Sequence, residues 1–144
     1  MTAAIDTAVR PLPAGRANPY HKAAVEIGVA GADPHQLISM LFDGYATAVA
    51  EARGAMRRGD VATKCAAISR AVRIVDEGLR AGLDPRAGGA LARDLDDLYL
   101  YVTRRLTEAN LLNREALLDE CMSLMQPIHE AWVAIAPRRA PAAS

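Results

Sequence analysis

The feature that most constrains the fold is a series of four segments in which apolar residues recur at spacings of three and four. The clearest segment steps four, three, four, three and four residues, through Val61, Cys65, Ile68, Val72, Val75 and Leu79. Such spacing places the apolar side chains on one face of an α-helix. No segment alternates with a period of two for long enough to form a strand, so the sequence predicts an all-α fold.

Capping residues mark the ends of these helices. Asp33 precedes a proline and is followed three residues later by Gln36, which is the pattern of an N-cap with a capping box. Gly59 is predicted to end this first long helix, and Asp60 to cap a second one that ends at Gly82. Because the linker is so short, the two helices are expected to lie antiparallel.

Two more helices are predicted after the turn sequence LDPRAGG. The third begins its apolar stripe at Leu91 and ends near Asn110, and Asn113 is expected to cap the fourth. The inward positions of the fourth helix are predicted to be Leu117, Cys121, Leu124, Ile128, Trp132 and Ile135. Pro127 interrupts it at a cost of about 3 kcal/mol or more, so we expect a kink or a short break there. The whole pattern predicts an antiparallel four-helix bundle.

The bundle domain is predicted to span residues 19–136. Residues 1–18 contain prolines and small side chains, which cannot bury enough surface to order themselves, and are predicted to be a flexible N-terminal arm. Residues 20–29 are predicted to form a helix that lies across the bundle as a cap. This helix is expected to be short, because Gly28 and Gly31 follow quickly. Residues 137–144 are predicted to be a disordered tail.

Composition excludes several classes of function. The 17 basic and 17 acidic residues are balanced, and the arginine pairs are scattered, which argues against nucleic acid as a partner. The sequence shows no signal-peptide pattern and no apolar run near the roughly 18 residues that span a bilayer. Cys65 and Cys121 fall on apolar stripes, as reduced cysteines do. We therefore expect a cytoplasmic protein without membrane insertion.

No motif in the chain predicts an active site. A di-iron bundle needs Glu-x-x-His pairs, and the nearest match, Gln126 with His129, has an amide in place of the carboxylate. The other histidines, His21 and His35, lie in separate segments, and no nucleophile or phosphate-binding motif is present. The sequence thus predicts a protein that is not an enzyme, with no catalytic residue, no cofactor and no metal site.

The first and third long helices carry more apolar residues than one bundle seam requires. The main stripe of the first contains Leu37, Leu41 and Tyr45. The residues that extend its apolar arc are Ile38, Phe42 and Val49. Those off the main stripe of the third helix are Leu100, Tyr101, Leu111 and Leu112. Either the N-terminal arm covers these side chains, or they form exposed patches that bind a partner.

Gly44 lies inside the first helix, where a glycine costs about 1 kcal/mol relative to alanine. Two interpretations account for a glycine at this position. The absence of a side chain would let the backbone of a partner approach closely, or it would let two helices of the bundle pack tightly. The sequence leaves both interpretations open.

At these residues the chain resembles a known family. The segment LISMLFDGYATAVAEA is similar to the leucine-tyrosine-aspartate-glycine signature of the flagellar export chaperone family FliS, with Phe42 in place of the tyrosine. The resemblance continues in DPHQL, KCAAISRAVRIVDEGLRAGLD, LARDLDDLYLYVTRRLTEAN and EAW, and covers about residues 19–133. Asp94, where the family often has asparagine, and Pro127 depart from the pattern.

The resemblance implies a cytoplasmic chaperone built as an antiparallel helical bundle. Such a protein would bind the disordered C-terminal segment of flagellin, prevent its premature polymerisation and deliver it to the flagellar type III export apparatus, whose components would be further partners. It also implies that an N-terminal segment with a tyrosine, matched here by Tyr20, occupies the client groove when no client is bound.

On this hypothesis one set of residues forms the client-binding groove and another occludes it. The residues assigned to the groove or its floor are Leu37, Leu41, Phe42, Gly44 and Tyr45. Tyr99 and Tyr101 are assigned to its opposite wall, and Tyr20 to the self-occluding cap. Phe42 lies off the main seam and is expected to contact the client, whereas Tyr45 and Tyr99 are equally compatible with a purely structural role.

Two other interpretations remain at this point. In the first, the chain is a structural homo-oligomer, such as a homodimer, whose extra apolar faces pair with a second copy. In the second, it is a small-ligand carrier, which would require a closed apolar cavity.

Overall fold

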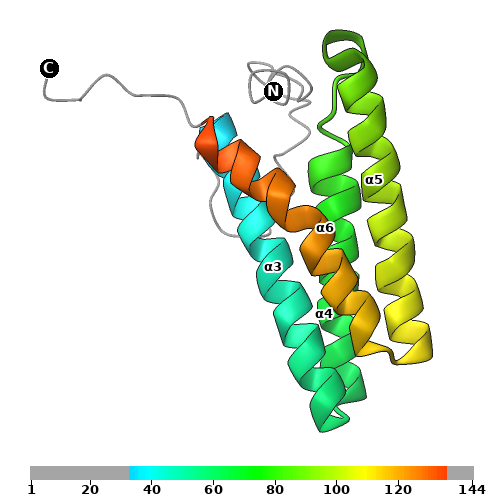
Figure 1. Ribbon diagram of the computed structural model, residues 1–144. Coiled ribbons are helices and arrows are strands. Elements are labelled where there is room, and N and C mark those ends of the chain that lie inside the picture. Colours follow the sequence, from blue (N-terminus) through cyan, green and yellow to red (C-terminus); the bar gives the residue numbers. More distant parts are fainter. Residues whose placement is uncertain (1–32, 136–144) are drawn as a thin grey trace, which may run out of the picture.

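The computed structural model describes residues 33–135, and these residues form an all-α bundle, as the sequence predicts (Figure 1). Its elements are α3 (Pro34–Arg58), α4 (Val61–Arg73), the π-helix η1 (Ile74–Arg80), α5 (Pro85–Leu112) and α6 (Glu115–Ala134). None of the described residues belongs to a β-strand. The predictions for the arm, the capping helix, Tyr20 and the tail fall on residues 1–32 and 136–144 and lie outside the described residues.

The helices are arranged around one core with successive helices side by side (Figure 1). α3 packs against α4, η1 and α6, and α5 packs against the same three elements from the other side. α3 and α5 therefore occupy opposite corners of the bundle. This arrangement decides which of the predicted residues can share a surface.

The centre of the bundle is apolar and contains one buried hydroxyl group that crosses between helices. The Tyr45 hydroxyl on α3 donates a hydrogen bond of 2.9 Å to the carbonyl oxygen of Cys121 on α6. Burial raises the pKa of Tyr45 above its ordinary value, and burial likewise raises the pKa of the Cys121 thiol to about 12. The fully buried side chains of the same core include Leu41, Val49, Val102, Leu106 and Leu118.

The predicted caps of the first two helices are confirmed. The Asp33 carboxylate accepts a hydrogen bond of 2.9 Å from the backbone N–H of Gln36, and that of Asp60 accepts one of 3.1 Å from Thr63. Gly59 ends α3 in the left-handed conformation, with φ 71°. These local signals were sufficient because they depend only on neighbouring residues.

The third helix begins earlier than its apolar stripe suggests. The Asp84 carboxylate caps it by accepting from the backbone N–H groups of Arg86 and Ala87, so the predicted turn sequence already forms helix from Pro85. Gly89, with φ 53° and ψ −130°, interrupts this first stretch before the main part of α5. The turn is therefore confined to Gly89, a conformation that only glycine adopts readily.

The prediction that Asn113 caps the fourth helix is wrong. Asn113 instead ends α5, which extends to Leu112, in the left-handed conformation with φ 53° and ψ 48°. Asparagine is one of the few residues that tolerate this conformation. Its side-chain oxygen accepts a hydrogen bond of 3.1 Å from Lys64 on α4, while α6 begins after Arg114 without a side-chain cap.

Of the two outcomes expected at Pro127, a kink or a short break, the fourth helix shows the kink and no break. α6 is continuous from Glu115 to Ala134, and Figure 1 shows its axis bending as it crosses α3. Contacts of Met125 and Trp132 with the core hold the parts before and after the proline in place. Leu118 and Met125 occupy buried positions, whereas Leu124 and Ile128, which were predicted to point inward, are only half-buried.

The π-helix is a feature that periodicity did not reveal. η1 packs against α3 at two glycines, one on each side of the contact. A Cβ atom at Gly44 would lie 3.4 Å from the Ile74 side chain, an ordinary van der Waals distance, whereas a Cβ atom at Gly78 would lie 3.1 Å from the buried Leu41 side chain. Gly44 thus faces another helix of the bundle, and the tighter approach occurs at Gly78.

These two glycines form a matched pair for a stability test. We expect Gly44→Ala to raise the free energy of unfolding by up to about 1 kcal/mol, because alanine is the better helix former and fits the space. Gly78→Ala is expected to lower it by about 1 kcal/mol or more, because the fully buried Leu41 has little room to move. Urea denaturation followed by Trp132 fluorescence measures both; equal effects of the two substitutions would contradict the packing described here.

Candidate functional site

The interface between α3 and α6, which we call the α3/α6 seam, contains the predicted residues Phe42 and Tyr45. At its lower end in Figure 1, where α3 ends and α6 begins, two ion pairs join the helices. Arg57 donates hydrogen bonds of 2.7 and 2.6 Å to the two carboxylate oxygens of Glu115. One turn along α3, Arg53 lies 3.1 Å from Asp119. Arg57 also holds the pKa of the Glu115 carboxyl below its ordinary value.

The upper part of the same seam is closed by two stacked ring pairs. His35 stacks on Trp132 with ring centroids 4.6 Å apart, and Phe42 stacks on His129 at 5.1 Å. Nε2 of His35 donates to the Trp132 carbonyl at 2.7 Å, and the Trp132 indole N–H donates to the His35 carbonyl at 3.0 Å. These contacts fix the C-terminal half of α6 to the start of α3.

Between the two closed parts lies an open region, which we call the α3/α6 cleft. Its volume is about 270 Å³, and it is lined by Phe42, Tyr45, Ala46, Met122, Met125, Gln126, His129 and Glu130. Gln126 and Glu130 are solvent-exposed, so the cleft opens at the surface and is not a closed ligand cavity. Ala46 has the smallest side chain in this lining. Because its methyl group fills little space, a gap remains between the two helices at this position.

The cleft combines an apolar floor with a polar rim. Its floor is formed by aromatic and methionine side chains, and its polar groups lie at the rim, where the Glu130 carboxylate accepts a hydrogen bond of 3.1 Å from Gln126. The nearby Cys121 thiol is buried, with its pKa raised to about 12, and is therefore protonated at neutral pH. No three His, Cys, Asp or Glu side chains within residues 33–135 are placed to share a metal ion.

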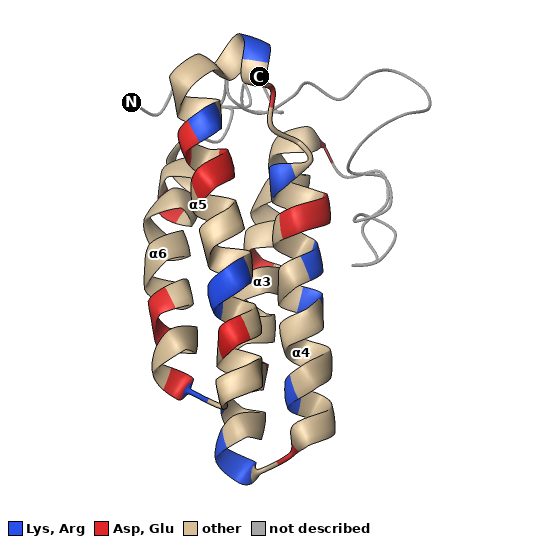
Figure 2. Cartoon of the chain, turned by 90° about the vertical axis from the view of Figure 1, so that its right-hand side faces the viewer, with Lys and Arg blue, Asp and Glu red and all other residues tan. Residues whose placement is uncertain are grey.

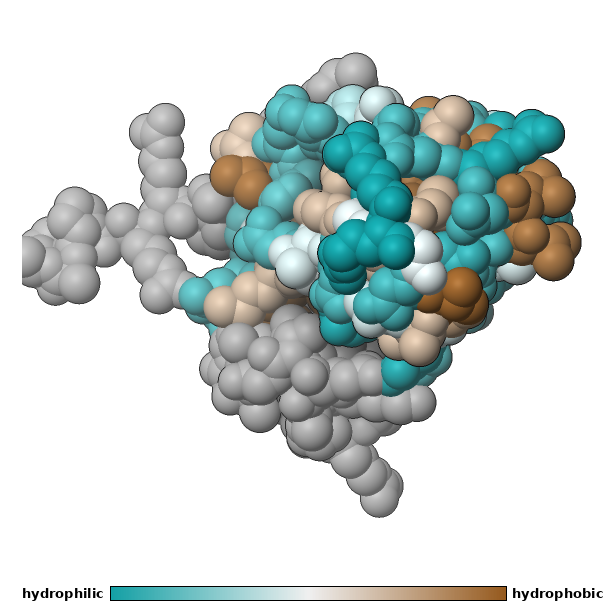
Figure 3. Space-filling model, turned by 90° about the horizontal axis from the view of Figure 1, so that it is seen from below, coloured by the Kyte–Doolittle hydropathy of each residue, from teal (hydrophilic) through white to brown (hydrophobic). Residues whose placement is uncertain are grey.

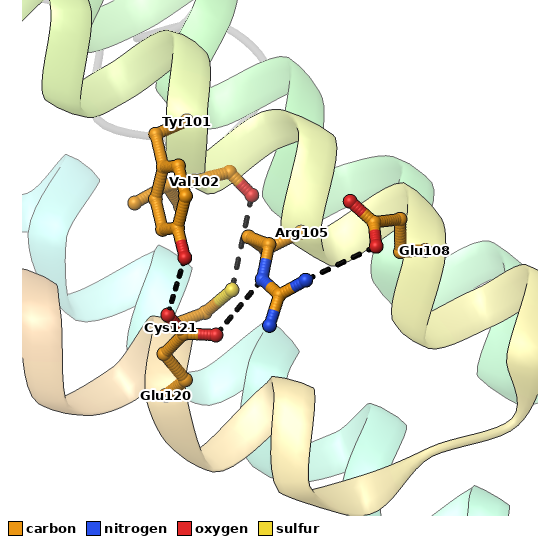
Figure 4. Close-up of polar contacts among 6 residues, drawn as sticks. All are labelled: Tyr101, Val102, Arg105, Glu108, Glu120 and Cys121. Carbon is orange, nitrogen blue, oxygen red and sulfur yellow. Dashed lines mark hydrogen bonds and ion pairs between the residues drawn. The ribbon is translucent and has the colours of Figure 1, made fainter.

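A second polar cluster joins α5 to α6 at a different corner of the bundle (Figure 4). The Tyr101 hydroxyl donates a hydrogen bond of 2.6 Å to the Glu120 carboxylate, which also accepts one of 2.9 Å from Arg105. Arg105 in addition pairs with Glu108 at 3.1 Å. The hydrogen bonds from Tyr101 and Arg105 lower the pKa of Glu120, and the same contact with Glu120 raises the pKa of Tyr101.

The residues predicted to form the client groove do not share one surface. Four of them are buried in the core, namely Leu37, Leu41, Tyr45 and Tyr99. Phe42 is only 2% exposed but forms one edge of the α3/α6 cleft, whereas Tyr101 is 41% exposed and lies at the α5/α6 corner. Gly44 faces η1. Because α3 and α5 are at opposite corners, Tyr99 and Tyr101 do not stand across a groove from α3.

Sequence reasoning missed most of the residues that line the cleft. Those on α6 are Met122, Met125, Gln126, His129 and Glu130, and the one on α3 is Ala46. Met122, Gln126 and His129 recur at spacings of four and three, which was a usable signal for one helix face. That signal does not reveal which helix lies opposite, and a single alanine carries no signal for a gap.

The remaining surface of the bundle carries mixed charge. Figure 2 shows basic and acidic residues interspersed along α5, whereas α4 carries basic residues only and the acidic ones follow in η1. Within residues 33–135, no helix combines the length and the apolar composition that crossing a membrane requires.

The ion pairs of α6 predict a defined loss of stability in acid. The pKa values of Glu115 and Glu120 are lowered in the fold, so their stabilising effect is present above the ordinary glutamate pKa of about 4.3 and is lost as pH falls below it. We expect the double variant Glu115→Gln/Glu120→Gln to melt below the wild type at pH 7 and to converge with it near pH 3. Circular dichroism melts check this, with Asp97→Asn as a control for charge removal. A constant difference between pH 7 and pH 3 would contradict it.

Known proteins that are similar to this chain belong to the family that the sequence suggested. A sequence model of the family described as flagellar protein FliS matches residues 16–139. The flagellar secretion chaperone FliS of Salmonella typhimurium is 46% identical over 119 residues, which are 83% of this chain and 88% of that protein. The flagellar secretion chaperone FliSB of Pseudomonas aeruginosa is 42% identical over 113 residues, 78% of this chain and 89% of that protein.

A third relative, the flagellar secretion chaperone FliS of Escherichia coli, is 37% identical over 113 residues, 78% of this chain and 83% of that protein. The residues matched by the family model include every described helix. The three alignments cover between 83% and 89% of the relatives' own lengths. The resemblance stated from the sequence is confirmed, and the chain belongs to the FliS family of flagellar secretion chaperones.

Proposed function

We propose that this chain is a cytoplasmic export chaperone that binds the disordered C-terminal segment of flagellin. Bound in this way, flagellin would be kept from polymerising before export and would be delivered to the flagellar type III export apparatus. Membership of the FliS family supports the class of function. The observation that supports binding is an apolar cleft placed directly beside the signature Leu41–Gly44 and open to solvent.

The physical basis of this role is coupled folding and binding. An amphipathic segment that cannot bury its apolar face alone can order itself on a helical groove. Such interfaces typically bury about 1,000–3,000 Å², and ordering the segment costs about 2–5 kcal/mol of the interaction energy. The resulting affinity is moderate, which suits a chaperone that has to release its client at the export apparatus.

The predicted site residues take different parts in this proposal. Phe42 and Tyr45 line the cleft and would contact the client, with Leu37 and Leu41 supporting them from the core. Gly44 would act through the packing of α3 on η1. Tyr99 would support the core beneath α5, and Tyr101 would offer a second contact at the α5/α6 corner.

Tyr20 and the segment around it would compete with the client for the cleft. When an internal segment occupies a binding surface, the apparent affinity for a ligand falls by the fraction of molecules that are already closed. The segment would thereby protect the apolar cleft before a client is available.

The described surface gives less support to a structural homodimer. The most exposed large apolar residues are Leu111, at 80% exposure, with Val61, Leu112 and, on α6, Val133. Leu111 and Leu112 are the last residues of α5 and Val61 is the first of α4. Figure 3, the view from below, shows hydrophobic groups in small clusters that hydrophilic groups separate from one another. Stable interfaces between copies require a contiguous apolar core.

The proposal predicts the outcome of a calorimetric titration. A peptide from the C-terminal segment of the host's flagellin, titrated into the full chain, is expected to bind with a large negative heat-capacity change, because apolar surface is buried. Removal of residues 1–30 is expected to strengthen binding, because the competing segment is lost. Absence of binding to both proteins would overturn the proposed function, and equal affinities would overturn the competition by the N-terminal segment alone.

Substitution of Phe42 tests the contact that it is proposed to make. Phe42→Leu is expected to weaken peptide binding by roughly two- to tenfold, because the ring forms an edge of the cleft and an aromatic contact contributes about 0.5–1.5 kcal/mol. The matched control is Leu98→Ala on α5, which removes a half-buried side chain away from the cleft. Unchanged affinity of a folded Phe42→Leu protein, with Trp132 fluorescence as the check on folding, would refute the contact.

A further inference from the structure

We infer that the α3/α6 cleft holds a single apolar side chain of the client segment, and that Asp43 and Glu130 bind a lysine or arginine that follows or precedes this anchor in the client. The inference rests on the proposed function and specifies the kind of segment that the site selects. It depends on the shape of the seam, on the chemistry of the cleft floor and on the charges of α6.

The shape of the seam restricts the opening to one position. Below the cleft, α3 and α6 are joined by the ion pairs of Arg53 and Arg57, and above it by the stack of Phe42 on His129. Between these long side chains, α3 presents the single methyl group of Ala46. The gap is therefore short along the helix axis and suits one inserted side chain better than a continuous helix face.

The floor of the cleft suits an apolar anchor of variable shape. A cavity of about 150 Å³ is large enough to hold benzene, so the volume of about 270 Å³ accommodates a leucine, methionine or phenylalanine side chain. Met122 and Met125 form much of this floor, and the unbranched methionine side chain adapts to different apolar neighbours. The cleft thus selects apolar character without fixing the identity of the anchor.

The charges of α6 indicate what lies next to the anchor. This helix carries four carboxylates and neither lysine nor arginine. Three of the carboxylates pair with an arginine of a neighbouring helix, in the pairs Glu115–Arg57, Asp119–Arg53 and Glu120–Arg105. Glu130, at the rim of the cleft, has no lysine or arginine partner among the described residues. A lysine or arginine of the client would give Glu130 the kind of cationic partner that the other three carboxylates of α6 have.

Asp43 adds to the negative charge beside the same opening. Its side chain is 70% exposed and lies 3.4 Å from Nε2 of His129, whose ring lines the cleft. No lysine or arginine of the described residues lines the cleft. An exposed ion pair changes affinity by only about two- to fivefold, so the rim is expected to act mainly on selectivity and on the rate of association.

Filling the cleft tests the anchor. Ala46→Leu is expected to leave the bundle folded, because the added atoms enter existing space, and to weaken binding of the flagellin C-terminal peptide about tenfold or more. Ala46→Val, which adds less volume, provides a second variant should the leucine disturb folding. The matched control is Ala66→Leu, an exposed position on α4, which packs against α3 and α5.

Removing the rim charges tests the choice of client residue. Asp43→Asn/Glu130→Gln is expected to weaken peptide binding about two- to fivefold at low salt and to reduce its dependence on salt. Asp97→Asn, an exposed carboxylate on α5, is the control. A peptide in which the basic residues flanking the apolar anchor are replaced by glutamine should bind the wild type and the Asp43→Asn/Glu130→Gln variant with equal affinity.

The outcomes separate the inference from the proposed function. If the wild-type chain binds no flagellin peptide, both fail. If the wild type binds and folded Ala46→Leu and Ala46→Val proteins bind equally well, the anchor site is refuted while the proposed function stands. If the cleft-filling variants lose binding and the double rim variant behaves like Asp97→Asn, the basic residue is refuted and the apolar anchor stands.

Discussion

The hydrogen bond from the Tyr45 hydroxyl to the Cys121 carbonyl fixes how the rest of the bundle is assembled. A buried hydroxyl without a partner is costly, so this bond of 2.9 Å permits essentially one register of α6 on α3. Ala46 and Met122 are the next residues along the two helices, and both line the cleft. The position of the candidate site is therefore a consequence of a contact made in the core.

On either side of the Tyr45–Cys121 hydrogen bond, different interactions hold α3 and α6 together. The ion pairs near the start of α6 are exposed and weaken in salt or acid, whereas the stacks of His35 on Trp132 and of Phe42 on His129 depend on ring contact and two short hydrogen bonds. The cleft lies where one kind of closure gives way to the other. Such a site can admit a side chain while the helices that form it stay anchored at both ends.

Local signals in the sequence predicted most of the fold, and the failures occurred where tertiary contacts competed with them. Asp33, Gly59 and Asp60 were assigned correctly because a cap depends on nearby backbone. Asn113 was assigned to the wrong helix, because both ends accept asparagine and its bond to Lys64 on α4 decided between them. At Pro127 the expected kink is present and the alternative, a break, is not, because core contacts on both sides outweigh one lost hydrogen bond.

The sequence by itself determined the all-α class, the caps of the first two helices and the membership of the FliS family, since these follow from spacing, capping residues and motifs along one chain. It also singled out α3 as unusually apolar. Only the tertiary structure decided that Phe42 and Tyr45 border a cleft while Leu41 lies wholly in the core, and that Tyr101 lies between α5 and α6 instead. The reason is physical: periodicity defines the faces of a helix, but the neighbour that covers each face is set by how all the helices pack together.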